Sequence, residues 1–275
     1  MELKSIIAPP EHQPEELNSK ISESMENLQS DSINGVIRSL DKIILWSKHN
    51  QKKTGYFAAL YRKVTIKVKE GIDSGEFEDG ERMERLDVIF ANRYLEAFEQ
   101  YCASQKTTKC WSLAFELGDK WEPIALQHLM IGMNAHINLD LGIAAAQTVT
   151  PENLSDLKND FEKINSLLAA LVDELQSELA EIWPFFKLID KFAGNTDEAL
   201  ANFGMKIARG KAWQLALDYA KENPDKQHNL IEAADCKVYL LGNLLAKPGL
   251  RLRLILLLIR FGEPKRVSKI IEILE

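Results

Sequence analysis

The chain contains 275 residues, of which 45% are hydrophobic, and it carries a formal net charge of −7 at pH 7. This composition supports a hydrophobic core in one large domain or two, and the negative charge argues against a general nucleic-acid binder, because affinity for phosphates needs clustered Lys and Arg. The three cysteines show no CxxC spacing, which fits reduced cytoplasmic thiols and disfavours a disulfide framework or a zinc ribbon.

Residues 1–31 are polar and acidic and contain prolines, and we expect them to form an N-terminal arm. Their beginning lacks the basic region and apolar run of a signal peptide, so the sequence predicts a cytoplasmic protein. Helical spacing of apolar residues starts directly after the arm and continues almost to the end of the chain. We therefore expect a single helical domain over residues 32–275.

In the first half of the chain, apolar positions recur at helical spacing over residues 33–49, 55–73, 81–104, 111–118 and 121–148. Only residues 64–68 have some strand character, and their neighbours favour a helix. Thr150 and Pro151 are typical of an N-cap followed by proline at the first helical position. A further helix should therefore begin there and run to about residue 182.

The second half continues the helical pattern over residues 197–223, 227–246, 249–261 and 264–274. No internal repeat interrupts this series, and the predicted connections are short. The sequence therefore predicts an all-α fold, a multi-helix bundle of mostly antiparallel helices around a buried central helix.

The predicted helix over residues 121–148 is unusually apolar but contains two stripes of polar side chains. At about 100° per residue, His128, His136 and Asp140 fall on one stripe. The second stripe contains the amides of Gln127, Asn134 and Asn138. Buried polar groups cost free energy unless they are paired, so this helix either carries a site or is held by a hydrogen-bond network. Gly132 lies between the histidines and should let a ligand or a neighbouring helix come close.

His136 and Asp140 are four residues apart and can both reach one metal ion. An imidazole with a carboxylate suits zinc, manganese or iron, so the pair predicts a single divalent-metal site or an acid–base pair. His128 lies two turns away, about 12 Å along the axis, too far to join the same ion easily. It is either an acid or base at the far end of a cleft or a structural histidine.

A second predicted helix, over residues 81–104, offers a partner for this stripe. Asp87 shares a face with Tyr94 and with apolar positions that should lie in the core. As a buried carboxylate, Asp87 could orient the imidazole of His136 or act as a third ligand. Tyr94 would donate a hydrogen bond into the same space.

Two classes of function remain open. The first is a hydrolase that acts by acid–base or single-metal chemistry on a small or lipid-like molecule. Its catalytic residues would be His136, Asp140, Asp87 and His128, and its substrate-binding residues would be Asn134, Asn138 and Tyr94. The alternative is a non-enzymatic helical binding or scaffold protein, in which the polar stripe is a structural hydrogen-bond network. The sequence contains no HExxH, P-loop, GxSxG or GxGxxG motif that would name a reaction.

The C-terminal helices, residues 236–275, are basic and rich in leucine. Residues 236–269 include eight Lys or Arg and a single acidic residue, Glu263. The run 250–269 is either a core helix whose arginine stems cover apolar surface or a face in peripheral contact with an anionic membrane. Its strongly apolar part, residues 254–259, is far too short to span a bilayer.

The block HLMIGMNAHINLDLGIAAA, with AHINLDL as its most specific part, resembles the signature of an uncharacterised, mainly bacterial family of unknown function. Three further segments look like other blocks of that family: GEFEDGERMERLDVIFANRYLEAF, the segment around Trp111, and ARGKAWQLA. The resemblance covers roughly residues 55–220 and implies an all-helical domain without an established reaction. The His-x-x-x-Asp spacing is also similar to that of helical zinc phospholipases, but this chain lacks the further histidines of a trinuclear centre.

Overall fold

A computed structural model describes residues 25–168, 182 and 197–275 of the chain. The described part is all-α and contains no strand, which confirms the predicted fold class. Residues 64–68, which have some strand character in the sequence, lie within a helix. The elements are, in chain order, α2 (Ile33–Asn50), α3 (Gly55–Asp73), α4 (Gly80–Cys102), α5 (Lys109–Leu117), α6 (Ala125–Ala135), η1 (His136–Asp140), α7 (Leu141–Thr148), η2 (Pro151–Leu157), α10 (Asp197–Lys221), α11 (Pro224–Ala246), α12 (Leu250–Gly262) and α13 (Val267–Leu274).

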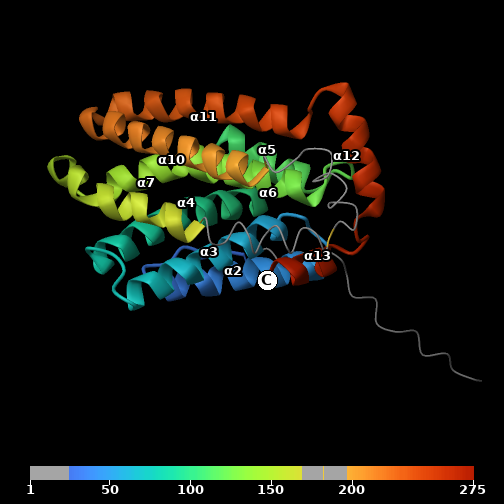
Figure 1. Cartoon of the computed structure of the whole chain (residues 1–275), viewed down its shortest axis with the longest axis horizontal. Helices are drawn as coiled ribbons and strands as arrows, with labels where there is room; N and C mark the ends of the chain where they lie inside the picture. Colours follow the sequence, from blue (N-terminus) through green and yellow to red (C-terminus); the bar gives the residue numbers. More distant parts are fainter. Residues whose placement is uncertain (1–24, 169–181, 183–196) are drawn as a thin grey trace, which may run out of the picture.

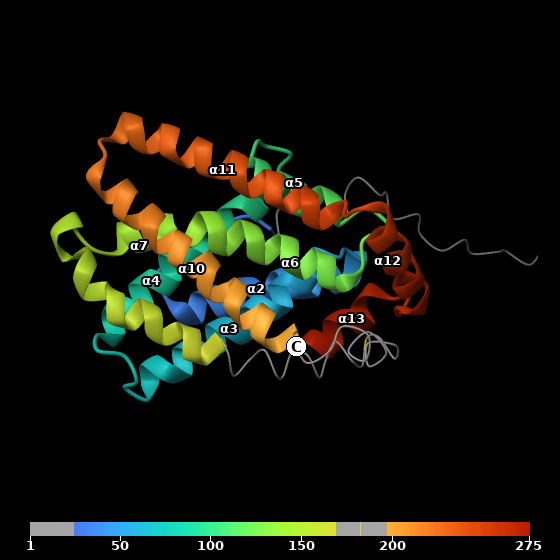
Figure 2. The same cartoon turned by 45° about the horizontal axis from the view of Figure 1, so that its top comes forward.

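The continuous segment α6–η1–α7 forms the centre of the bundle, as the sequence predicts. Figures 1 and 2 show α10 and α11 on one side of it and α2 and α3 on the other. Helix α12 crosses one end of the bundle, and α13 returns the chain to α2 and α3 (Figure 1). No helix in the described part of the chain combines the length and the apolar composition that crossing a membrane requires.

The central helix begins later than its sequence pattern indicates and changes its winding in the middle. It starts at Ala125, where the side chain of Gln127 accepts a hydrogen bond from the Ile124 amide at 3.1 Å. Residues His136–Asp140 form one turn of π-helix, in which the Leu141 amide donates to the His136 carbonyl. Such turns are rare and are frequently found at functional sites.

Two further boundaries differ from the sequence prediction. The helix expected to begin at Pro151 starts as a 3₁₀-helix, Pro151–Leu157, and becomes α-helical over residues 158–168. Its predicted continuation toward residue 182 falls mostly outside the described residues. Of the predicted arm, residues 1–24 also lie outside them, but Met25 and Leu28 are buried in the core.

The core consists of two clusters of apolar side chains that meet beside the central helix. One cluster joins α2, α3, α4, α5 and α13 to α6, and the other joins α7 and α10 to the first turns of α4 and to residues 154–164. Close helix contacts depend on glycine at Gly132, where an added Cβ would lie 2.6 Å from the Phe57 ring. This contact agrees with the close approach that the sequence predicts at Gly132.

Candidate functional site

Asp140 is the centre of a buried hydrogen-bond network that joins three helical elements. Its Oδ1 accepts a hydrogen bond from Arg93 Nε at 2.8 Å, and its Oδ2 accepts one from Trp111 Nε1 at 2.8 Å. The Nδ1 atom of His136 lies 3.4 Å from the same Oδ2. Burial alone would raise the pKa of Asp140, but Arg93 and the hydrogen bonds outweigh it, so the pKa is lowered and the carboxylate is charged.

The imidazole of His136 is enclosed by aromatic rings. It stacks on Phe90 and lies edge-on to Tyr61, with ring centroids 4.4 Å apart. Burial lowers the pKa of His136 despite the opposing effect of Asp140, so the ring is neutral at physiological pH. Because Nδ1 faces a carboxylate, it carries the proton, and Nε2 is left with a lone pair that has no hydrogen-bond partner.

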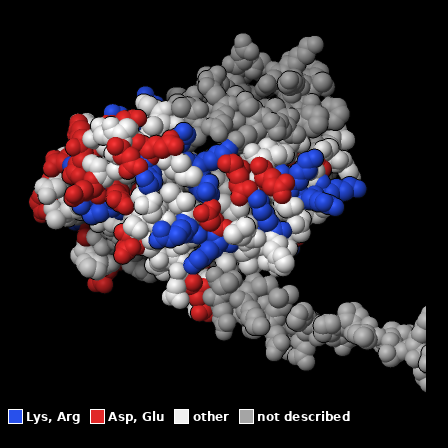
Figure 3. All heavy atoms as spheres, turned by 90° about the horizontal axis from the view of Figure 1, so that it is seen from below, with Lys and Arg blue, Asp and Glu red and all other residues white. Residues whose placement is uncertain are grey.

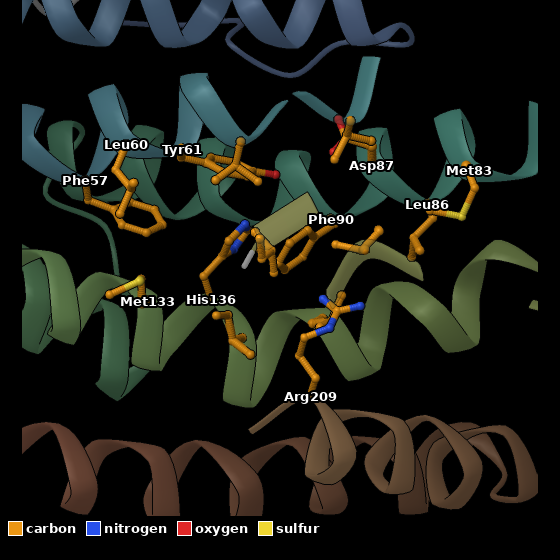
Figure 4. A pocket seen from close by; sticks show the side chains of 16 residues that line it. Phe57, Leu60, Tyr61, Met83, Leu86, Asp87, Phe90, Met133, His136 and Arg209 are labelled. Atoms are coloured by element: carbon orange, nitrogen blue, oxygen red, sulfur yellow. The ribbon is translucent and has the colours of Figure 1, made fainter. Parts of the chain in front are cut away.

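Beside His136 lies a cavity of about 90 Å³, at the junction of the two core clusters (Figure 4). Its wall is predominantly apolar and comes from α3, α4, the central segment, residues 164 and 168, and α10. The lining residues are Phe57, Leu60, Tyr61, Val64, Val68, Met83, Leu86, Asp87, Phe90, Met133, His136, Ile137, Leu141, Ile164, Leu168 and Arg209.

Four of these lining residues have a buried polar atom without a hydrogen-bond partner. The atoms are Tyr61 Oη, Asp87 Oδ2, His136 Nε2 and Arg209 Nε. In Figure 4 Tyr61 and Asp87 lie on one side of the cavity and Arg209 on the other, with His136 between them. Native proteins leave few buried polar groups unpaired, so four around one cavity indicate a site that a ligand would complete.

Arg209 and Asp87 give the cavity its electrostatic character. The guanidinium of Arg209 donates to the Phe161 carbonyl and lies 4.4 Å from the centre of the Phe161 ring, but among the described residues it has no carboxylate partner. Burial lowers its pKa to about 10, so it remains charged at neutral pH. Burial, reinforced by Glu84, raises the pKa of Asp87 to about 7.

The structure thus brings together two of the predicted site residues, Asp87 and His136, on the cavity wall. Asp140 stands behind His136 and holds its ring, but it does not line the cavity. Tyr94 is buried among aromatic rings, and its hydroxyl has no hydrogen-bond partner. Burial raises its pKa.

The other three predicted residues lie elsewhere. Asn134 Nδ2 donates to the Val238 carbonyl at 2.9 Å, and Asn138 Nδ2 donates to Asn134 Oδ1 at 3.0 Å, so these amides connect the central segment to α11. His128 is buried against Tyr56. Burial, with the charges of neighbouring basic residues, lowers the pKa of His128 to about 3.

The metal hypothesis for His136 and Asp140 stays a prediction. Both oxygens of Asp140 already accept hydrogen bonds from protein donors. Among the residues that the structure describes, no group of three or more His, Cys, Asp or Glu side chains is placed to hold a metal ion. The described residues therefore offer no further ligands to complete such a site.

Three residues around the site, Tyr61, Arg93 and Arg209, are not among those predicted from the sequence. A signal for Arg209 exists, because it lies on one helical stripe with three buried residues, Ala212, Trp213 and Ala216. A charged residue inside an otherwise apolar stripe indicates a buried charge with a specific role. Tyr61 and Arg93 carry no comparable signal, since aromatic and long basic side chains are common at such positions.

The family of unknown function DUF5995 matches residues 33–248 of the chain. This match extends beyond residues 55–220, for which the sequence blocks show a resemblance, and it includes all the residues that line the cavity. No curated protein and no solved structure matches the chain.

Proposed function

We propose that this chain, which belongs to the DUF5995 family of unknown function, binds a small organic acid in the cavity beside His136. The observation that carries the proposal is the set of four buried polar atoms without partners around one apolar cavity. A ligand with an apolar body and a few polar groups would fill the space and satisfy these atoms. Without it, each unpaired group costs about 1–3 kcal/mol.

The charge on Arg209 supports an acid as the ligand. A buried guanidinium is normally paired with an anion, and this one has no such partner among the described residues. A carboxylate on the ligand would accept hydrogen bonds from Arg209 and from the hydroxyl of Tyr61. Asp87 would be protonated below about pH 7 and could donate a third.

The size of the cavity limits the ligand. A volume of about 90 Å³ is well below the roughly 150 Å³ of a cavity that admits benzene, so the ligand should have fewer non-hydrogen atoms than a benzene ring. This is the size of a very short carboxylic acid such as acetate or propionate. The lipid-like ligand that the sequence predicts is therefore restricted here to a short apolar body.

The test compares acids with neutral molecules of matched shape. Titration calorimetry with acetate and propionate, against ethanol and propanol, should show tighter binding of the acids by roughly tenfold to a hundredfold, the range for a charge-assisted hydrogen bond. In Arg209→Met this preference should disappear while the folded state survives, because Met fills similar volume. Lys211→Met, an exposed change on the same helix, should keep the preference.

Two results would contradict the proposal. One is equal affinity for acid and alcohol in the unchanged protein. The other is a large loss of thermal stability in Arg209→Met without ligand. Such a loss would show that Arg209 stabilises the folded state by itself and has a purely structural role. If the cavity binds an acid, removing an unpaired buried charge should leave the stability unchanged or raise it.

A second candidate function, ester hydrolysis, is favoured by the pKa of Asp87 near 7 and by the free lone pair on His136 Nε2. In this scheme Nε2 takes a proton from water as the oxygen attacks the ester carbonyl, and protonated Asp87 gives its proton to the leaving alcohol. The bond to the alcohol breaks, and the product is a carboxylate of the kind that Arg209 would hold. Asp140 keeps the imidazole in the required tautomer.

Proton release from methyl acetate, followed in a pH-stat, tests the hydrolysis scheme independently of binding. The rate should fall above about pH 7 as Asp87 loses its proton. His136→Gln and Asp87→Asn should both abolish it without unfolding the chain. No release above the spontaneous rate would refute hydrolysis of such esters and would leave the binding proposal standing.

The scaffold alternative is supported by a different part of the polar stripe. Asp140, Asn134 and Asn138 all have hydrogen-bond partners, and these bonds fix α4, α5 and α11 against the central segment. Such a satisfied network stabilises one packing arrangement and needs no ligand. It does not account for the unpaired atoms around the cavity.

A further inference from the structure

Helix α12 presents most of its apolar side chains to solvent. None of its 13 residues is buried. The side chains of Leu250, Leu258 and Phe261 are each 74% exposed, and Leu254 is 56% exposed. These four residues recur at intervals of four, four and three, so they form a single stripe along the outer face of the helix.

One arginine of α12 helps to attach the helix to the bundle. Arg260 turns toward the bundle, where its Nε donates to the Trp121 carbonyl at 2.7 Å and its Nη1 pairs with Glu263 at 2.8 Å. The helix is attached to the bundle through this side chain and through Leu256 and Ile259, which pack against the core, while Leu250, Leu254 and Leu258 face outward. No residue of α12 is buried, so the helix is not the core helix that one interpretation of the sequence predicts, although Leu256 and Ile259 pack against the edge of the core.

An exposed tryptophan extends the apolar stripe. The side chain of Trp121 is 51% exposed and contacts the ring of Phe261 edge-on, with centroids 5.5 Å apart. Tryptophan is enriched where apolar surface meets the headgroup region of a bilayer. Isolated exposed leucines are ordinary, but this contiguous group of leucine and aromatic side chains indicates a contact surface.

Basic side chains surround the stripe. Six exposed Lys and Arg residues have no ion pair among the described residues: Lys247, Arg251, Arg253, Lys265, Arg266 and Lys269. Glu263, the single acid between residues 236 and 271, is buried. Figure 3 shows Lys and Arg gathered at the end of the molecule where α12 lies in Figure 1, and Asp and Glu gathered at the opposite end.

We propose that α12 and Trp121 form a docking surface for an anionic lipid membrane, with the helix lying in the plane of the headgroups. Thirteen residues give a helix about 20 Å long, which suits an interfacial helix and is too short to span the hydrocarbon core. The leucine stripe would enter the lipid, and the basic side chains would contact anionic headgroups. A second copy of the chain fits less well, because two such surfaces would bring like charges together.

The experiment is co-sedimentation of the whole chain with vesicles of phosphatidylcholine alone and of phosphatidylcholine with phosphatidylglycerol. Binding should occur with the anionic vesicles and weaken as salt is added. Leu258→Glu should reduce it at least about tenfold, because the leucine no longer enters the lipid. Arg251→Gln should reduce it more modestly, by about fivefold, in keeping with one charge near the surface.

The matched control is Leu45→Glu, which changes a leucine of α2 that is also exposed and should leave binding unchanged. Both leucines are on the surface, so neither variant should lose its fold. Equal binding to neutral and anionic vesicles, or none to either, would overturn the proposal. So would a concentration-dependent dimer that Leu258→Glu abolishes, since the occupant of the surface would then be a second copy.

Discussion

Replacing Asp87 with asparagine should stabilise the folded chain at about pH 8 and have little effect at about pH 4. The folded protein keeps the proton on Asp87 up to about pH 7, whereas the unfolded chain loses it near 3.8. Between these values the unfolded state binds fewer protons, so Asp87 lowers the stability progressively as the pH rises. At 1.36 kcal/mol per pKa unit, the full penalty above about pH 7 is at most about 4 kcal/mol. Asparagine has no charge to desolvate and therefore escapes this penalty.

Urea unfolding followed by tryptophan fluorescence, at a series of pH values from about 4 to 8, measures the difference between Asp87→Asn and the unchanged chain. The variant should become increasingly more stable than the unchanged chain as the pH rises, and this difference in the free energy of unfolding should level off above about pH 7. Asp73→Asn, an exposed change on α3, should stay within about 0.5 kcal/mol of the parent throughout. A gap for Asp87→Asn that does not depend on pH, or a loss of stability at about pH 8, would show that the carboxyl group is charged when folded and would refute the reasoning.

Two further changes test the packing around the site by the same unfolding assay. Asp140→Ala should cost about 3 kcal/mol because it leaves a partly buried arginine and a buried indole without their acceptor. Asp41→Ala, which removes a half-exposed ion pair, should cost less than about 1 kcal/mol, and similar losses for the two would contradict a buried network. Gly132→Ala should cost about 1–3 kcal/mol because its Cβ would lie 2.6 Å from the Phe57 ring. Gly210→Ala, where the added Cβ meets nothing within 4 Å, should instead stabilise the chain by up to about 1 kcal/mol. If Gly132→Ala left the stability unchanged, the Phe57 ring would be free to move away from the added Cβ.

The sequence by itself determined the features that depend on neighbours along the chain. Helical spacing predicts the helices and the central position of the apolar segment, and both are confirmed. The contact between His136 and Asp140 follows from an interval of four residues, although the π-helical turn between them is a local change that the pattern does not show. The burial of Asp87 also follows, because its position on the apolar face of α4 is set by helix geometry.

Only the tertiary structure decided what these side chains face. Asp140 receives its partners from α4 and α5, and the cavity takes Tyr61 from α3 and Arg209 from α10, a residue distant in the sequence. For α12 the leucine pattern fits a buried helix and a surface helix equally well, and the packing of the bundle leaves it outside. The physical reason is the same in each case: periodicity states which face of a helix is apolar, and the free energy of packing against other helices decides what covers that face.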